Sequence, residues 1–355
     1  MSDRIVLDHG SGGRRSRDLV RSVFQSRLSN AALDAETDAA ILALPASTSA
    51  AGPTRLAVTT DAYVVKPLKF PGGDIGRLAV CGTVNDLAVS GAEPLCLTAS
   101  FIIEEGFPTA DLESIVDSMA AAATDAGVRI VAGDTKVTEH GECDGLFITT
   151  SGVGIVGEGR EGIAGASLVA VGDVILVNGP IGDHGAAVAC VRNGIATDPP
   201  LVSDLAPLSG LIQQLYSAGI TPHFMRDATR GGVATVLCEL AEMRSIGVEI
   251  REESIPIRDT VRGVCEIYGF DPLYLANEGT MICVVDQADA APAIAAMREH
   301  PLGRSAAIIG EALAGDDAGR AGSSRAISSR ATIRTTIGGR RILRMLAGEQ
   351  LTRIC

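Results

Sequence analysis

The sequence predicts an α/β protein of two domains. Its 355 residues exceed what one hydrophobic core normally serves, so about two domains are expected. Hydrophobic residues make up 46% of the chain and aromatic residues only 3%, so the core must be built largely from aliphatic side chains, which favours layers of helix and sheet. Segments with strand and helix patterns also alternate along most of the chain.

The first domain is expected to cover residues 1–157. Hydrophobic periodicity predicts a helix over 17–28, a strand that begins at residue 55 and ends at Asp61, a helix over 74–91, a strand over 95–103, a helix over 108–127, and strands over 128–137 and 146–157. Proline and acidic residues begin the helix over 108–127 and a glycine follows it, as helix ends favour.

The second domain is expected to cover residues 158–331. The glycine-rich stretch 158–173 leads into a strand over 174–179, helices over 184–193, 204–218 and 230–243, a strand over 281–286 and a helix over 288–300. The Gly, Ser and Ala bias of 315–330 is typical of a mobile surface segment. Residues 332–355 then form a C-terminal segment.

Charge and composition exclude several classes of partner. The formal net charge of −13, with no Arg/Lys run interleaved with aromatic residues, argues against nucleic acid and anionic membranes. A cytoplasmic location is expected, because the start lacks a basic and then apolar signal pattern and no stretch of about 18 apolar residues occurs. The eight cysteines form no CxxC pair and no cluster with His, so neither a disulfide framework nor a zinc site is indicated.

Four aspartates, Asp61, Asp86, Asp134 and Asp227, lie beside glycine or at the expected end of a strand or helix. Each alone is more often a capping or turn residue. Together they suggest more, because several carboxylates with few basic partners would repel a phosphate unless hard cations lay between them, which is how Mg²⁺ usually holds a nucleotide. The set predicts a magnesium nucleotide site, with Asp61, Asp86 and Asp227 as metal ligands.

A glycine-rich loop, HGSGG, precedes the first helix. The backbone N–H groups at Gly10, Gly12 and Gly13 are candidates for phosphate binding, although such turns are more often only turns. Neither a Walker A string nor a GxGxxG motif is present, so nucleotide binding depends on the whole set of residues.

Eight strings distributed over the whole chain carry a family resemblance. They are HGSGG, TTDAYVVKPLKFPGGDIG, VNDLAVSGAEP, AGDTKV, IGDHGAA, MRDATRGGVA, NEG and the terminal RIC. In order and spacing they resemble the HypE family of hydrogenase maturation proteins. The wider group that the chain resembles is the PurM-like ATP-binding family of aminoimidazole ribonucleotide synthetase, selenide water dikinase and thiamine phosphate kinase.

The resemblance implies an α/β N-terminal domain that binds ATP and dimerises through its sheet, an α+β C-terminal domain and a flexible C-terminal tail. It also implies a carbamoyl dehydratase, in which a carbamoyl group received on Cys355 is dehydrated with ATP to a thiocyanate, the cyanide source for [NiFe]-hydrogenase iron. The expected partners are a second copy of the chain, the carbamoyltransferase HypF as donor and the HypC–HypD complex as acceptor. ATP and Mg²⁺ are the expected cofactors.

The resemblance assigns roles to further residues. Glu278 in ANEGTM is expected to accept a proton, and Lys136 in GDTKV to relay a proton or stabilise phosphate, whereas composition alone favours solvated loop residues for both. His184 lies near the nucleotide or only caps the following helix, and the sequence leaves both open. The residues expected to bind the nucleotide are Gly10, Gly12, Gly13, Asp61, Asn85, Asp86, Asp134, His184 and Asp227.

The chemistry makes sense of these residue types. The oxygen of a thiocarbamate is a poor leaving group that becomes a good one once ATP phosphorylates it. Dehydration then requires a base that removes the N–H protons while phosphate departs, and a carboxylate tuned by its surroundings can serve.

A terminal cysteine also fits a carrier. With eight cysteines in 355 residues, chance puts one at the end about 2% of the time, although a frayed end with an idle cysteine is the plain alternative. Eight extended residues from Gly348 reach about 27 Å, enough to enter a neighbouring cleft. Arg353 is expected to favour the thiolate. Thr352 stands where the family usually has proline, which puts the preset shape of the tail in question but not the carrier role. Ala228 stands where DPTRGG is common in the family.

Two rival functions remain. A selenide or thiamine-phosphate kinase would use the same scaffold, but the first cysteine here is Cys81, far from the glycine loop, and a thiamine-phosphate kinase leaves Cys355 unexplained. A non-catalytic adaptor that docks a partner through its tail is the rival from another class.

Overall fold

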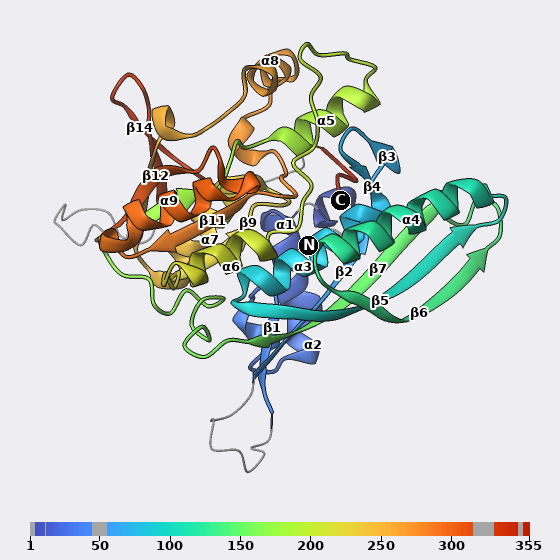
Figure 1. Cartoon of the computed structure of the whole chain (residues 1–355). Coiled ribbons are helices and arrows are strands. Elements are labelled where there is room, and N and C mark those ends of the chain that lie inside the picture. The colour runs from blue at the N-terminus through green and yellow to red at the C-terminus, as the bar shows by residue number, and fades with distance from the viewer. Residues whose placement is uncertain (1–3, 11, 45–54, 315–329, 347–350) are drawn as a thin grey trace.

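The computed structural model describes residues 4–10, 12–44, 55–314, 330–346 and 351–355. These residues contain a five-stranded sheet, a seven-stranded sheet and a two-stranded hairpin (Figure 1). The expected boundary at residue 157 lies between the last strand of the first sheet and the first strand of the second. No helix among the described residues has the length and apolar character needed to cross a membrane.

The first sheet is mixed, with the order β1-β2-β7-β5-β6. Only β5 and β6 run parallel, and the other neighbours are antiparallel. Buried residues alternate along β7, so one face of the sheet points into the core. The strands are β1 (Ala40–Ala43), β2 (Arg55–Tyr63), β5 (Ala92–Glu104), β6 (Arg129–Thr138) and β7 (Leu146–Val156), and the hairpin strands are β3 (Lys69–Phe70) and β4 (Gly73–Asp74).

Helix α3 (Ile75–Val89) lies between the two sheets and carries two of the expected site residues. Asp74 caps its first turn, accepting hydrogen bonds from the N–H groups of Gly76 and Arg77 at 2.8 and 3.0 Å. Nearly all of α3 is buried, since its apolar residues contribute to the cores of both halves. Helix α4 (Thr109–Asp125), close to the bounds expected from the sequence, packs beside it.

The second sheet has the order β14-β13-β10-β12-β8-β11-β9 and is antiparallel except between β10 and β13. A mostly antiparallel sheet with helices agrees with the α+β class that the resemblance implied. Its strands are β8 (Val174–Val177), β9 (Phe224–Asp227), β10 (Gly247–Arg251), β11 (Met281–Val285), β12 (Ala307–Leu313), β13 (Ala331–Arg334) and β14 (Arg340–Ile342). The helices are α5 (Asp183–Arg192), α6 (Ser209–Ser217), α7 (Gly232–Arg244), α8 (Asp259–Tyr268) and α9 (Ala290–Glu299).

Three expected segments differ from the structure, and several elements, among them α8, β10 and β12, were not expected. The helix expected over 17–28 is interrupted: α1 (Arg14–Leu19) and α2 (Ser26–Leu28) flank a π-helical stretch. The helix expected from 204 begins only at Ser209, because Pro207 disfavours helical conformation in the residue before it. The segment expected from 332 begins inside the second sheet, because β13 pairs with β10. Most of the expected mobile segment, 315–329, lies outside the described residues.

Candidate active site

A cavity of about 220 Å³ lies where the two halves meet. Its lining brings together residues that are far apart in the sequence: Asp61 from β2, Asp86 from α3, Asp227 from the end of β9, Glu278 from the loop before β11, and Cys355 from the C-terminus. We call this space the acidic cavity. All three aspartates expected as metal ligands therefore face the same space as the expected base and the expected carrier thiol.

The carboxyl groups of the acidic cavity are crowded and poorly solvated. Burial, with the negative charges of Asp61 and Asp227, raises the pKa of Asp86 well above its usual value. The pKa of Asp227 is raised in the same way, by burial and by Asp38 and Asp61. Asp38, which the sequence analysis missed, also lines the cavity. Asp38 lies in the stretch NAALDAETDAA, which matches no recognised motif, so nothing in the sequence distinguishes this aspartate from its acidic neighbours.

Burial also raises the pKa of Glu278 well above its ordinary value, and the nearby charges of Asp204 and Asp227 add to the shift. The side-chain atom Oε1 of Glu278 is buried without a hydrogen-bond partner, as is Oδ2 of Asp227. Buried carboxylate oxygens without partners are costly. They are therefore candidates to face a ligand, a cation or a transferable proton.

The loop that carries Glu278 is fixed by buried polar contacts. The Asn85 amide donates to the carbonyl oxygens of Glu278 and Ala206 at 3.2 and 3.1 Å. Asp204 accepts from the backbone N–H groups of Glu278 and Gly279 at 3.1 and 3.0 Å. A Cβ at Gly279 would lie 1.9 Å from the Asp204 carbonyl oxygen, so only glycine fits there. Asn85, expected to bind nucleotide, orients the loop that carries Glu278 in this structure.

One arginine, Arg230, joins the glycine-rich loop to the acidic cavity. Its Nη1 donates to the carbonyl oxygen of Gly10 at 2.9 Å, and the negative charge of Cys355 is the largest cause raising the pKa of Arg230. Gly12 has φ +72°, and a Cβ there would lie 2.9 Å from the Arg230 Cβ. The loop can therefore come this close to Arg230 only because residue 12 has no side chain. Gly13 is buried, and the backbone carbonyl of Leu346 lies against it. Arg230 lies in the string MRDATRGG, in which only Asp227 was expected to act.

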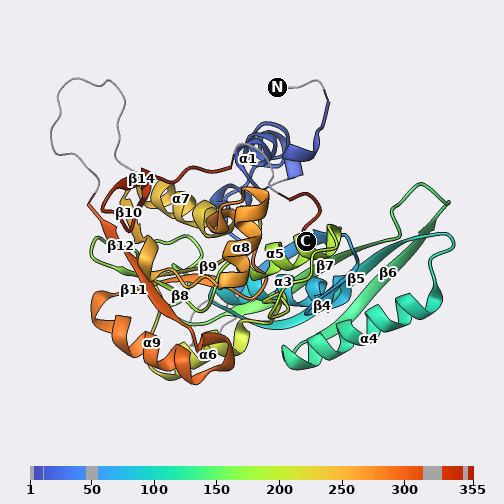
Figure 2. The same ribbon diagram turned by 90° about the horizontal axis from the view of Figure 1, so that it is seen from above.

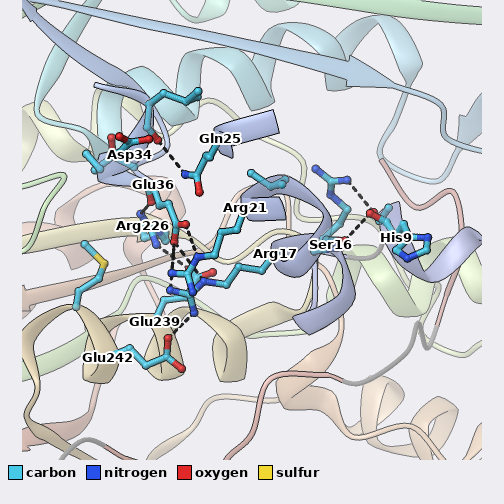
Figure 3. Close-up of a pocket in the computed structure, with 18 residues that line it drawn as sticks. His9, Ser16, Arg17, Arg21, Gln25, Asp34, Glu36, Arg226, Glu239 and Glu242 are labelled. Atoms are coloured by element: carbon cyan, nitrogen blue, oxygen red, sulfur yellow. Dashed lines mark hydrogen bonds and ion pairs between the residues drawn. The ribbon is translucent and has the colours of Figure 1, made fainter. Parts of the chain in front are cut away.

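A second cavity of about 950 Å³ adjoins this arginine and is lined by the N-terminal arm, residues 9–25, and by α7 (Figure 3). Its charged residues are paired with one another. Arg226 donates to Asp38 at 3.0 Å and to Glu239 at 2.7 Å, and Arg17 pairs with Glu36 and Glu242. The Arg17–Glu242 pair ties the arm to α7 of the second half, and the Arg226–Asp38 pair ties the residues before β1 to β9. The expected metal ligands do not line this larger space.

Lys136 and Asp134 do not reach the acidic cavity of their own chain. Both lie on β6, an edge strand exposed along most of its length, with side chains 70% and 63% exposed. Their side chains pair with each other at 2.9 Å. The hydrogen bond from Lys136 lowers the pKa of Asp134. The structure thus separates these two residues from the other expected site residues.

His184 contacts the tail and does not line the acidic cavity. Its Nε2 and the Ile354 carbonyl oxygen are 2.8 Å apart, and its Nδ1 lies 2.8 Å from the Ser203 hydroxyl. Burial lowers the pKa of His184. The last residues are docked in this structure: the carbonyl oxygens of Cys355 and Arg353 accept from the N–H groups of Val64 and Lys66, both at 3.2 Å. Mobility of the tail stays a prediction, and Gly348 lies outside the described residues.

The donor set of the acidic cavity fits Mg²⁺. The described residues contain no group of three His, Cys, Asp or Glu residues already arranged to enclose a metal ion. The cavity nevertheless offers hard carboxylate oxygens, one of them, on Asp227, buried and unpartnered. Mg²⁺ is commonly held by one or two carboxylates together with phosphate oxygens and water, so an incomplete protein cage is what a magnesium nucleotide needs.

Comparison with known proteins agrees with this arrangement. Residues 36–156 match the model of the AIR synthase related protein N-terminal domain, and residues 170–321 match that of its C-terminal domain. Carbamoyl dehydratase HypE of Rhodobacter capsulatus is 49% identical over 355 residues, which cover 99% of this chain and 98% of that protein. The chain belongs to the HypE family of carbamoyl dehydratases.

Solved HypE structures resemble the whole chain. HypE in complex with ATP is 42% identical, with a TM-score of 0.78 over 99% of this chain and 100% of that one. The chain of a HypE–HypF complex is 45% identical, with a TM-score of 0.80 over 92% and 99%. Thiamine monophosphate kinase from Aquifex aeolicus, at 17% identity and a TM-score of 0.61, shares the fold alone. The HypE resemblance and the PurM-like fold predicted from the sequence are thereby confirmed.

Proposed function

We propose that this chain uses ATP to dehydrate an S-carbamoyl group on Cys355 to a thiocyanate, which supplies cyanide to [NiFe]-hydrogenase iron. The observation that carries the proposal is that Cys355 lines the same cavity as Glu278 and the three aspartates. A thiol, a high-pKa carboxyl group and a set of hard oxygen donors are what phosphorylation followed by elimination requires.

The proposed reaction balances in two steps. The thiocarbamate oxygen attacks the γ-phosphorus of ATP, ADP leaves, and the nitrogen loses one proton, which gives an S-bound imidate phosphate. The C–O bond then breaks as the second N–H proton is removed, so phosphate leaves with the carbamoyl oxygen and a C≡N triple bond remains on sulfur. The sum is thiocarbamate plus ATP giving thiocyanate, ADP and phosphate.

Glu278 is the proposed proton acceptor. A carboxylate is a stronger base when its pKa is raised, and burial among other carboxyl groups raises that of Glu278. Its loop is held by Asn85 and Asp204, so its position does not depend on substrate. Its buried Oε1 has no hydrogen-bond partner that would compete for the proton.

The nucleotide is proposed to place its phosphates against the acidic cavity and the glycine-rich loop. Arg230 is suited to a phosphate oxygen, because it lines the cavity and its Nη1 already reaches the loop at Gly10. Mg²⁺ held by Asp61, Asp86 and Asp227 would offset the charge that phosphates bring into this carboxylate cluster. The cavity is smaller than the roughly 300–1,000 Å³ of ordinary ligand pockets, so it suits only the reacting groups.

A homodimer through the first sheet belongs to the same proposal. Strand β6 is an unpaired edge, and three of its apolar side chains, Ile130, Val131 and Val137, are 38%, 56% and 67% exposed. Lys136 lies on this strand, so its relay role requires that a second copy bring it to a cavity. Lys136 does not reach Glu278 of its own chain, so without such an interface it would reach no acidic cavity at all.

HypF is proposed as the carbamoyl donor, which the solved HypE–HypF complex of a relative supports. The HypC–HypD complex is proposed as the cyanide acceptor. The cytoplasm is the proposed compartment for both transfers.

Mass spectrometry of the C-terminal peptide tests the function. After incubation with a carbamoyl donor, Cys355 should gain a carbamoyl group, and it should then lose the mass of one water only when ATP is present. Glu278→Gln should accumulate the carbamoylated form with ATP still bound, because the amide cannot accept the proton. A tail that stays unmodified would support the adaptor instead, and normal thiocyanate yield from Glu278→Gln would remove Glu278 from the mechanism.

A further inference from the structure

The C-terminal tail is held mainly through its backbone. Its carbonyl oxygens at residues 352 to 355 all accept hydrogen bonds from groups outside the tail. The N–H groups of Val64 and Lys66 bond Cys355 and Arg353 in an antiparallel register, so residues 353–355 extend the edge that follows β2. The opposite side of the tail meets α5.

Helix α5 contributes one donor near each of its ends. Arg192, its last residue, donates to the carbonyl oxygens of Thr352 and Arg353 in the tail, and to that of Lys66 in the segment beside it. The planar guanidinium offers several donors at fixed angles, so one side chain fastens the tail and its neighbouring segment together. Both views place the C-terminus beside α5 (Figures 1 and 2).

His184, the second residue of α5, donates to the tail as a neutral ring. A carbonyl oxygen only accepts, so Nε2 must carry the proton in its 2.8 Å contact with Ile354. In a neutral ring Nδ1 is then an acceptor for the Ser203 hydroxyl, whose oxygen in turn accepts from the N–H of Leu205 at 3.1 Å. The hydrogen bonds can all form only if they donate from Ser203 to Nδ1 and from Nε2 to Ile354, so the neutral ring carries its proton on Nε2.

We propose that His184 and Arg192 form a backbone clamp that holds Cys355 in the acidic cavity during dehydration, and that this clamp must open before Cys355 can be carbamoylated. The proposal rests on the proposed function and adds two positioning residues to it. Both residues are anchored in the second half of the chain, whereas Val64 and Lys66 belong to the first, so the tail closes a seam between them.

A backbone clamp explains why Thr352 can replace the usual proline. The group of residue 352 that Arg192 binds is its carbonyl oxygen, which proline and threonine share. Side chains add to the docking, since Arg353 pairs with Asp144, Ile354 is buried, and Leu351 and Cys355 pack against apolar clusters, but none of these contacts involves the side chain of Thr352. The clamp therefore constrains the path of the tail more than its sequence.

The two reaction steps make opposite demands on the clamp. Dehydration needs the carbamoyl group beside Glu278, whereas a donor enzyme must reach a sulfur that in the docked state lines a cavity of about 220 Å³. Weakening the clamp should therefore slow dehydration and speed carbamoylation. A residue with a merely structural role would not move the two steps in opposite directions.

Arg192→Ala tests the clamp, because Arg192 is only partly buried and its loss should not prevent folding. We expect Cys355 to react with a polymer-linked maleimide at least tenfold faster, carbamoylation by the donor to be faster than in wild type, and single-turnover dehydration of the pre-carbamoylated protein to be at least tenfold slower. ATP affinity should stay unchanged. Arg192→Lys keeps the positive charge but lacks the planar guanidinium, so its labelling and dehydration rates should lie between those of wild type and Arg192→Ala.

His184→Phe gives a second variant, for which maleimide labelling of Cys355 should again be faster than in wild type; labelling is the readout because His184 Nε2 also lies 4.0 Å from Oε1 of Glu278. The variant keeps a ring near Phe70, which His184 meets edge-on at 5.2 Å between centroids, but it has no donor for Ile354. The matched control is Arg298→Ala, which removes an arginine that also binds a backbone carbonyl, that of Ala306, remote from the tail. The control should match wild type in both steps.

Wild type measured in parallel separates the two proposals. If wild type forms no thiocyanate, the proposed function fails. If wild type does form it, and Arg192→Ala either leaves maleimide labelling unchanged or dehydrates at the wild-type rate, the clamp is refuted. Parallel loss of both steps in Arg192→Ala would also refute it.

Discussion

The side chain of Ile354 makes the strength of tail docking measurable. It is 5% exposed and belongs to the same apolar cluster as Val65 and Phe70. Ile354→Ala removes three carbon groups from this contact, and at about 0.8 kcal/mol for each the docked state should lose about 2.4 kcal/mol. Because 1.4 kcal/mol is a factor of ten, the undocked population should rise roughly fiftyfold. The cavity term of core mutations is omitted, since an undocked tail leaves no enforced void.

The assay is the rate at which Cys355 reacts with a maleimide that carries a polymer too large for the acidic cavity. When docking is faster than labelling, this rate follows the undocked population, so it should also rise roughly fiftyfold. Cys96 and Cys143 are partly exposed, so the labelled peptide must be identified by mass. Ile337→Ala is the control, because Ile337 is 93% exposed. A rate for Ile354→Ala within about twofold of wild type would refute the docking argument.

Three further predictions concern stability. Burial raises the pKa of Asp183 to about 6, well above the usual value for an aspartate, so its contribution to stability is largest below pH 4 and falls as the pH rises toward 6. Asp183→Asn should therefore gain about 2 kcal/mol relative to wild type between those pH values, after allowance for solvent screening, as measured by urea unfolding. Asp86→Asn should raise the melting temperature of the ligand-free protein, because it removes one of several repelling carboxyl groups, and should abolish the further rise that Mg²⁺ and ATP produce. Gly279→Ala should cost about 3 kcal/mol or more in urea unfolding, because its Cβ would meet the Asp204 carbonyl.

Each of these predictions has an outcome that contradicts it. Asp183 is not the titrating group if the difference between Asp183→Asn and wild type stays constant from pH 4 to 7. The repulsion argument for Asp86 fails if the ligand-free melting temperature falls. The control for Gly279 is Gly263→Ala, which lies in α8 with open space around it and should stabilise by about 0.5–1 kcal/mol. Equal effects at the two glycines would show that the loop around residue 279 can relax.

The fold could be predicted from the sequence where a segment is long and strongly periodic. Helices α3, α4, α5 and α7 lie within a few residues of their expected bounds, because each has an apolar pattern at helical spacing and a glycine or a cap near one end. The short strands β9, β10, β12, β13 and β14 were not expected. They are held by long-range pairing, such as that of β13 with β10, which no local pattern contains.

The residues of the candidate site could be predicted where they belong to a motif. The backbone hydrogen bonds that position them could not. Asp61, Asp86, Asp227, Glu278 and Cys355 were each chosen from a motif or from the chain end, and the fold brings them to one cavity. The bonds that position them were not foreseen. The donors from α5 bind tail carbonyls that every residue type possesses, so sequence alone gives no signal for them.

The acidic cavity has walls from both halves of the polypeptide, and this ties chemistry to the relative orientation of the two sheets. The Asn85 amide reaches from α3 to carbonyl groups on the far side of the seam, where a small tilt would break its bonds before apolar packing was lost. Splitting the chain between residues 157 and 173 would leave Asp38, Asp61 and Asp86 in one fragment and Asp227, Glu278 and Cys355 in the other. Neither fragment alone would hold the complete set of residues proposed for the reaction, so we expect activity only where the two halves are joined in this orientation.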